Sequence, residues 1–272
     1  MNRLAGKVAV VTGASPNIGG AIARGFAAEG AAVVCTDIDE AVAAVCAESI
    51  MASGGQAIAV AGDVTDPEHA ESTVAQAVQR WGQVDVLVNN AMWFNRKGLL
   101  TAPIEEFRRQ LDIILGGAFL FTQAVSRAMI DGKRGGSIIN VLSTAAWQGE
   151  PGNIGYCTGK SGLINFSRSA AMELAEYGIR VNNFTPTATM PTDPELARAM
   201  AAAMAAHTSM YSMDFAGAMP LSRLPSPSDY VPALVYLAAD ESAMVTGTNL
   251  TVDGGATARY WPWMPHSDDT KS

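Results

Sequence analysis

Cysteine and histidine are scarce in this sequence, which limits the chemistry that it can support. Its 272 residues include three cysteines, Cys35, Cys46 and Cys157, and three histidines. An odd number of widely spaced cysteines makes no disulfide framework, and no Cys-x-x-Cys pair or histidine cluster indicates a metal site. We therefore expect reduced thiols, no metal and a cytoplasmic protein.

Basic charge and long apolar runs are also limited. The chain has 18 Lys and Arg against 26 Asp and Glu, a net charge of −8. Such a chain lacks the basic surface that binds nucleic acid. The first apolar run, residues 8–11, is too short for a secretory signal, and no uninterrupted apolar segment is long enough to cross a bilayer. We expect neither a nucleic-acid partner nor a membrane partner.

What is present is an alternation of short apolar runs with segments of helical periodicity. The runs at 8–11, 31–36, 56–60 and 84–88 are rich in Val, Ile and Ala and are bounded by turn residues. Continuous apolar runs are typical of parallel strands that are covered on both faces. No repeat or low-complexity linker divides the chain, so residues 1–272 are predicted to form one α/β domain.

A glycine turn directly follows the first of these runs. Residues 12–19 read Thr-Gly-Ala-Ser-Pro-Asn-Ile-Gly and lead into a helical segment, 20–30. Free backbone amides at the start of a helix can bind a pyrophosphate, and strand, glycine turn, helix is the order in which they do so. The turn favours a Rossmann-type, doubly wound parallel sheet in three α/β/α layers. The alternative is an ordinary strand-to-helix turn without a ligand.

Asp37 stands at the end of the second apolar run, eighteen residues after Gly19. A carboxylate there can accept both ribose hydroxyls of NAD and repels the 2′-phosphate of NADP. The alternative is a helix N-cap, since Asp37 and Asp39 both precede the helical segment 40–52. The position favours NAD as the cofactor.

A serine, a tyrosine and a lysine form the candidate catalytic set. Tyr156 and Lys160 are four residues apart, on one face of a predicted helix, and Ser143 ends an apolar run thirteen residues before Tyr156. The lysine cation is expected to lower the pKa of the phenol, which could then exchange a proton with an alcohol near neutral pH. Ser143 would hold the same oxygen. Alone, the Tyr and Lys pair also suits a solvated surface.

Together with the glycine turn, this set resembles the short-chain dehydrogenase/reductase family over residues 6 to about 255. The resemblance implies an NAD-dependent oxidoreductase that interconverts a secondary alcohol and a ketone, and a homotetramer. Ser143, Tyr156 and Lys160 are then catalytic, and Lys160 also binds ribose. The cofactor contacts that follow are Gly13, Ser15, Asn17, Ile18, Gly19, Asp37, Ile38, Asp63, Val64, Asn90, Ala91, Tyr156, Lys160, Pro186 and Thr189.

Three residues depart from the family pattern. Asn17 replaces a glycine, and we expect it to adopt the left-handed conformation that asparagine tolerates best after glycine. Met92 replaces another glycine. Ile114, on a predicted helix from 103 to 129, replaces an asparagine that the family uses to hold a water beside the lysine. These departures leave open an NAD-binding sensor or scaffold with weak or lost catalysis.

Aromatic and thioether side chains suggest the substrate. Met92, Trp93 and Trp147 follow predicted strands at the edge where substrates enter such sheets, and residues 187–220 are rich in Met and Ala. A flexible lid over a bulky apolar, aromatic or steroid-like alcohol is one interpretation, and a dihydrodiol is another. The methionines would otherwise be packing residues. The aromatic tail, 259–272, is expected to pack on a groove or a neighbouring subunit.

Overall fold

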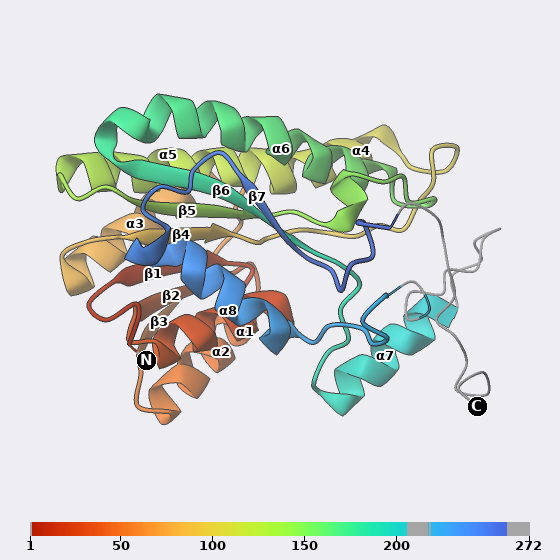
Figure 1. The fold of residues 1–272 in the computed structure, drawn as a ribbon, viewed down its shortest axis with the longest axis horizontal. Coiled ribbons are helices and arrows are strands. Elements are labelled where there is room, and N and C mark those ends of the chain that lie inside the picture. The colour runs from red at the N-terminus through yellow and green to blue at the C-terminus, as the bar shows by residue number, and fades with distance from the viewer. Residues whose placement is uncertain (1, 206–216, 218, 260–272) are drawn as a thin grey trace.

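The structure, a computed structural model, describes residues 2–205, 217 and 219–259 (Figure 1). A seven-stranded sheet lies at its centre in the order β3-β2-β1-β4-β5-β6-β7, with all neighbours parallel. The strands are β1 (Val8–Thr12), β2 (Ala32–Asp37), β3 (Gln56–Ala61), β4 (Val86–Asn89), β5 (Gly136–Val141), β6 (Ile179–Pro186) and β7 (Asn249–Val252).

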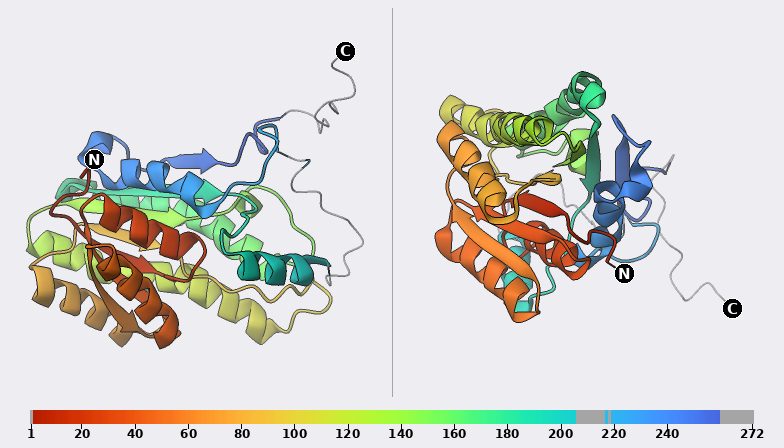
Figure 2. Two further views of the ribbon diagram at one scale, coloured as in Figure 1. Left: turned by 90° about the horizontal axis from the view of Figure 1, so that it is seen from below. Right: turned by 90° about the vertical axis from the view of Figure 1, so that its left-hand side faces the viewer.

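Helices cover both faces of the sheet (Figures 1 and 2). One layer holds α1 (Ile18–Ala28), α2 (Glu40–Ala52) and α8 (Pro227–Ala238). The other holds α3 (Pro67–Trp81), α4 (Ile104–Leu111), α5 (Gly117–Asp131) and α6 (Ile154–Leu174). The predicted Rossmann-type, doubly wound α/β/α fold is therefore confirmed.

Burial of the strands explains why their sequences are continuously apolar. Every residue of β1 is buried. Successive side chains of a strand point to opposite faces, and Val10 packs with Leu87 and Phe121 under one helix layer, whereas Val11 packs with Phe26 under the other. Each face thus has its own hydrophobic core, and neither face of β1 accommodates a charged side chain.

Acidic caps begin two of the helices. The Asp39 side chain accepts a hydrogen bond from the Ala41 amide at 2.9 Å and caps α2. Asp66 accepts one from the Glu68 amide at 2.9 Å and caps α3. Asp37 takes no part in capping α2 and remains at the carboxyl end of β2.

The predicted single α-helix over 103–129 is wrong in one respect. A π-helical turn, Asp112–Gly116, separates α4 from α5, and Ile114 lies within it. Taken as one helix, Ile104–Asp131 is long and apolar enough to cross a membrane, with a mean hydropathy of 1.5 over an 18-residue window. Phe121 and Met129 of this helix are buried against the sheet, so we interpret it as a core helix.

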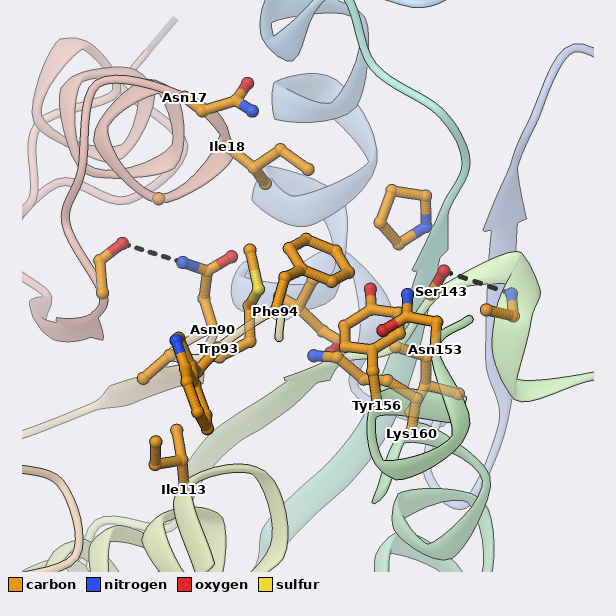
Figure 3. A pocket seen from close by; sticks show the side chains of 18 of the residues that line it. Asn17, Ile18, Asn90, Trp93, Phe94, Ile113, Ser143, Asn153, Tyr156 and Lys160 are labelled. Carbon is orange, nitrogen blue, oxygen red and sulfur yellow. Dashed lines mark hydrogen bonds between the residues drawn. The ribbon is translucent and has the colours of Figure 1, made fainter. Parts of the chain in front are cut away.

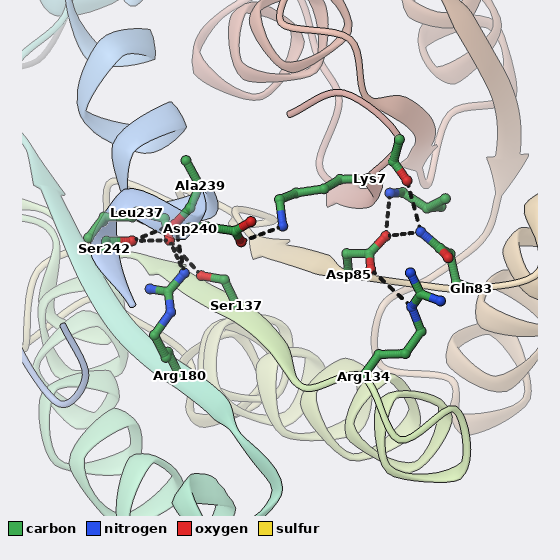
Figure 4. A network of polar contacts seen from close by, with 12 residues as sticks. Lys7, Gln83, Asp85, Arg134, Ser137, Arg180, Leu237, Ala239, Asp240 and Ser242 are labelled. Carbon is green, nitrogen blue, oxygen red and sulfur yellow. Dashed lines mark hydrogen bonds and ion pairs between the residues drawn. The ribbon is translucent and has the colours of Figure 1, made fainter. Parts of the chain in front are cut away.

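A polar network joins the amino ends of the strands, on the edge away from the site (Figure 4). Lys7 bonds Asp240 at 2.7 Å, and the Asp85 carboxylate accepts the Val8 amide at 2.7 Å. Arg180 donates to the carbonyl of Leu237 at 2.9 Å. These contacts hold together the amino ends of the strands. The carboxyl ends, on the opposite side of the sheet, remain available for a binding site.

The predicted lid and tail fall only partly within the described residues. Helix α7 (Pro194–Ala205) belongs to the segment 187–220 and lies beyond the carboxyl ends of the strands (Figure 1). Residues 206–216 and 218, and the tail from 260 onward, lie outside the described residues. The lid and the packing of the tail therefore stay predictions.

Candidate active site

A cleft of about 1240 Å³ opens at the carboxyl ends of the strands. It spans the place where strand order reverses, between β1 and β4, which is where doubly wound sheets bind ligands. Eighteen of the predicted site residues line it: Gly13, Ser15, Asn17, Ile18, Gly19, Asp37, Ile38, Asp63, Val64, Asn90, Ala91, Met92, Trp93, Ser143, Tyr156, Lys160, Pro186 and Thr189.

The glycine turn is built for close backbone approach. Gly13 has φ +66°, and a Cβ at Gly19 would collide with the Gly13 carbonyl oxygen. The Asn90 amide donates to that oxygen at 2.8 Å, which ties the turn to the end of β4 (Figure 3). The turn leads directly into α1, whose first backbone amides have no intrahelical partner. This cradle fits the pyrophosphate of a dinucleotide.

Asn17 does not adopt the expected left-handed conformation. Its φ is −90°, because the positive φ in this turn falls on Gly13 instead. An asparagine at this position therefore needs no left-handed backbone conformation. Its Oδ1 atom is buried and has no hydrogen-bond partner, so the turn presents one free acceptor within the cleft.

Asp37 is placed for ribose recognition. Its carboxylate accepts the Asp39 amide at 3.2 Å and takes part in none of the ion pairs of the described residues. Asp37 is half-buried, and burial raises the pKa of its carboxyl above the usual value. An unpaired acceptor at this point fits a diol and disfavours a phosphate.

Asp63, a predicted adenine contact, lines the cleft and also makes contacts within the protein. Its carboxylate is paired with Arg109 and accepts the Thr65 hydroxyl at 2.8 Å. These contacts orient the carboxylate of Asp63, and its adenine contact stays a prediction. Arg109 was absent from the predicted site, because no local pattern joins β3 to α4.

The serine, tyrosine and lysine converge from two elements (Figure 3). Ser143 follows β5 and accepts the Ala145 amide at 3.1 Å. Tyr156 and Lys160 both lie on α6 and are 7% and 2% exposed. The Lys160 ammonium donates to the Val141 carbonyl at 2.5 Å and lies 5.7 Å from the centre of the Tyr156 ring. The surface-pair alternative for these two residues is excluded.

Burial controls the ionisation of this pair. It raises the pKa of the Tyr156 phenol above its usual value, against a hydrogen bond from Ser143 that lowers it. Burial also lowers the pKa of Lys160 to about 7. The expected lowering of the Tyr156 pKa by Lys160 is therefore not found in this structure, since burial raises that pKa and Lys160 is not among the groups that shift it. The phenol is protonated at neutral pH.

Ile114 belongs to a small apolar cluster on the same side. It is 2% exposed and packs with Leu142, Leu163 and the Tyr156 ring. A Cβ at Gly159 would come within 3.1 Å of its side chain, so the π-turn is pressed against α6. The place of the family's asparagine is filled by hydrocarbon.

The substrate end of the cleft differs from the prediction at one residue. Met92 and Trp93 line it, and the Phe94 ring lies 4.4 Å from the ring of Tyr156. Trp147 does not line the cleft. Its indole N–H faces the Thr185 hydroxyl, 3.5 Å away at the end of β6, because the short helical turn after Ser143 directs it there.

The sequence analysis did not predict the polar residues that line the substrate end of the cleft. Gln148, Glu150 and Asn153 line the cleft beside Tyr156. A signal was available for one of them, since Asn153 precedes Tyr156 by three residues and residues at that spacing share a helix face. The arrangement as a whole can bind a dinucleotide, hold a substrate oxygen and exchange a proton with it.

Comparison with known proteins agrees with this geometry. A family model described as enoyl-(acyl carrier protein) reductase matches residues 13–257. The L-rhamnose 1-dehydrogenase (NAD(P)(+)) of Azotobacter vinelandii is 40% identical over 92% of this chain and 96% of its own length. The sorbitol dehydrogenase of Cereibacter sphaeroides is 35% identical over 93% and 98%.

Solved structures give the same result. The crystal structure of NAD⁺-bound xylitol dehydrogenase superposes with a TM-score of 0.85 at 32% identity. The superposition covers 92% of this chain and 99% of the xylitol dehydrogenase chain. A short-chain type dehydrogenase/reductase from Mycobacterium marinum superposes with a TM-score of 0.83 at 31% identity over 94% and 97%. The chain is an oxidoreductase of alcohol dehydrogenase type and belongs to the short-chain dehydrogenase/reductase family.

Proposed function

We propose that this protein is an NAD-dependent dehydrogenase that interconverts a secondary alcohol and a ketone on a small, polyhydroxylated substrate. One observation carries the proposal. Ser143, Tyr156 and Lys160 meet at one end of a cleft whose other end is formed by the glycine turn and Asp37.

Each residue of the set has one task. Ser143 donates a hydrogen bond to the substrate oxygen, and Tyr156 exchanges a proton with it. Lys160 binds ribose hydroxyls. The nicotinamide ring, when bound, supplies or takes the hydride. Because the phenol is protonated at neutral pH, the protein as it stands is ready to donate a proton to a ketone, and oxidation of an alcohol is favoured as the pH rises.

We propose NAD rather than NADP. Asp37 ends β2 and lines the cleft, and its carboxylate takes part in none of the ion pairs of the described residues. A 2′-phosphate placed there would meet a negative charge. The name of the rhamnose dehydrogenase includes both NAD and NADP, but that describes the relative. In this chain, the Asp37 carboxylate favours NAD alone.

The substrate class departs from the one expected from the sequence. A bulky apolar or steroid-like alcohol has no support among the relatives, which include rhamnose, sorbitol and galactitol dehydrogenases. The substrate end also carries polar groups, on Gln148, Glu150 and Asn153, beside its aromatic walls. We propose a sugar or polyol.

The test is NADH formation from NAD⁺ and a panel of alcohols: xylitol, sorbitol, galactitol, L-rhamnose, cyclohexanol and a hydroxysteroid. The proposal predicts turnover of at least one polyol or sugar, at a higher kcat/KM than cyclohexanol or the steroid. Preference for the steroid would reject the substrate class and keep the reaction. NAD⁺ binding without NADH from any alcohol would reject the reaction.

The second candidate is an NAD-binding sensor or scaffold with weak or lost catalysis. Ile114 favours it, because hydrocarbon stands beside the catalytic pair where the family holds a water. Ile114 does not block the cleft, however, and Ser143, Tyr156 and Lys160 are all in place. The panel above separates the two, since a sensor binds NAD⁺ and makes no NADH.

A further inference from the structure

One amide at the substrate end of the cleft is incompletely satisfied. Asn153 is 5% exposed and lines the cleft. Its Nδ2 atom donates to Glu150 Oε2 at 3.0 Å, whereas its Oδ1 atom is buried without a hydrogen-bond partner. A buried acceptor without a donor costs about 1 to 3 kcal/mol, so such an atom calls for a reason.

The neighbouring groups of the protein do not supply the missing donor. Asn153 begins α6, but its side chain makes no capping hydrogen bond. Gln110 packs under Gly155, two residues after Asn153. Its Nε2 donates to the Trp93 carbonyl, and its Oε1 is also unpartnered. A second acceptor cannot satisfy the first. The described residues therefore supply no donor to Asn153 Oδ1, and a hydroxyl group of a bound substrate is the candidate donor.

Glu150 fixes which atom of the amide faces the cleft. Turning the amide over would point Oδ1 at the Glu150 carboxylate, and two acceptors repel each other. The carboxylate is thus the reason that Asn153 presents oxygen rather than nitrogen. Glu150 is itself half-buried and lines the same end of the cleft.

The pair lies beside the reacting group. Asn153 precedes Tyr156 by one helical turn, and Figure 3 shows both with Ser143 on one side of the cleft. The charge of Glu150 acts on the Tyr156 phenol, which places it within electrostatic reach of the substrate oxygen.

We propose that Asn153 and Glu150 form a hydroxyl-binding subsite that selects substrates with a second hydroxyl near the reacting one. Both side chains present acceptors, and a hydroxyl is the donor that polyols and sugars carry. A carboxylate, phosphate or ketone offers no donor, and an anion is also repelled by Glu150. This inference rests on the proposed function and names the residues that set its substrate class.

The test compares kcat/KM for sorbitol and cyclohexanol, which differ in the hydroxyls beside the reacting carbon. Asn153→Ala is expected to lower kcat/KM for sorbitol by about 10- to 100-fold, mainly through a higher KM, and to lower kcat/KM for cyclohexanol by a clearly smaller factor. Glu150→Gln, which keeps the shape and can donate to Oδ1 itself, should also reduce selectivity for sorbitol. Thermal unfolding establishes that each variant folds.

Asn95→Ala is the matched control. Asn95 also donates to a glutamate, Glu106 at 3.3 Å, on a loop position that does not line the cleft. It should leave both substrates unchanged. Equal losses on sorbitol and cyclohexanol in Asn153→Ala, or no loss on either, would overturn the subsite. A parent that oxidises cyclohexanol but no polyol would also overturn it, whereas a parent that oxidises neither contradicts the proposed function itself.

Discussion

Lys160 shows how burial and charge compete at a single residue. Its ammonium is 2% exposed and has one hydrogen-bond acceptor, the Val141 carbonyl. The pKa falls to about 7 from the usual 10.5 because little water hydrates the cation. Attraction between the lysine and the tyrosine, argued from the sequence alone, neglects this loss of hydration, and the structure gives the opposite sign for the phenol.

Lys160→Met tests this account through stability. Between about pH 7 and about pH 10 the unfolded chain keeps the lysine proton while the folded chain loses it. Unfolding then takes up a proton, so the stability of the parent rises with pH, by at most about 1.4 kcal/mol per unit. The variant lacks this contribution. Urea unfolding at about pH 7.5 and about pH 9.5, at one protein concentration, should show the parent gaining stability relative to Lys160→Met. A constant difference would contradict a lowered pKa.

At the scale of elements, two aspartates at the junction of β2 and α2 have different roles. Asp39 caps α2, and Asp37 faces the cleft. Asp37→Ser is expected to lower the ratio of kcat/KM with NAD⁺ to that with NADP⁺ by about 10-fold or more, since the repulsion of the 2′-phosphate is lost. Asp39→Ala is the control, because loss of the cap should cost about 1 kcal/mol of stability and leave the ratio unchanged. An unchanged ratio in Asp37→Ser would contradict the ribose role.

The same scale shows what a sequence pattern can and cannot predict. Strands such as β1 were predictable because a continuous apolar run is typical of a parallel strand that is buried on both faces. The π-turn was not, since a shift of hydrogen bonding within a helix leaves the residue pattern nearly unchanged. The backbone conformation of Asn17 was mispredicted for a related reason. Which residue of the turn takes the positive φ depends on how the turn packs against the end of β4.

At the scale of the whole molecule, the sequence predicts those site residues that directly follow the ends of strands. Parallel strands bring Gly13, Asp37, Asn90 and Ser143 to one edge, and that follows from the strand order. The contacts of Arg109 with Asp63 and of Asn153 with Glu150 depend on how loops fold over that edge. Sequence patterns carry little information on such loops, and the direction of Trp147 was missed for this reason.

The outer face of the α5 and α6 layer bears on assembly. Phe119 on α5 is 50% exposed and Met172 on α6 is 67% exposed, and contact with another copy would bury these apolar side chains. We expect a homo-oligomer through this face. Light scattering after size exclusion should give a multiple of the 28.4 kDa chain, and Phe119→Glu should lower the mass. Val45→Glu, at a 60% exposed position on α2, should not. A monomeric parent would contradict this assembly.

The central claim is that the Tyr156 hydroxyl exchanges the proton with the substrate, and Tyr156→Phe tests it most directly. The variant removes one oxygen and keeps the ring that packs against Phe94 and Ile114. NADH formation and the Kd for NAD⁺ are measured on parent and variant with the best alcohol of the panel. We predict loss of turnover by about 100-fold or more with an NAD⁺ affinity nearly equal to that of the parent. Equal rates of turnover in the two proteins would contradict the claim.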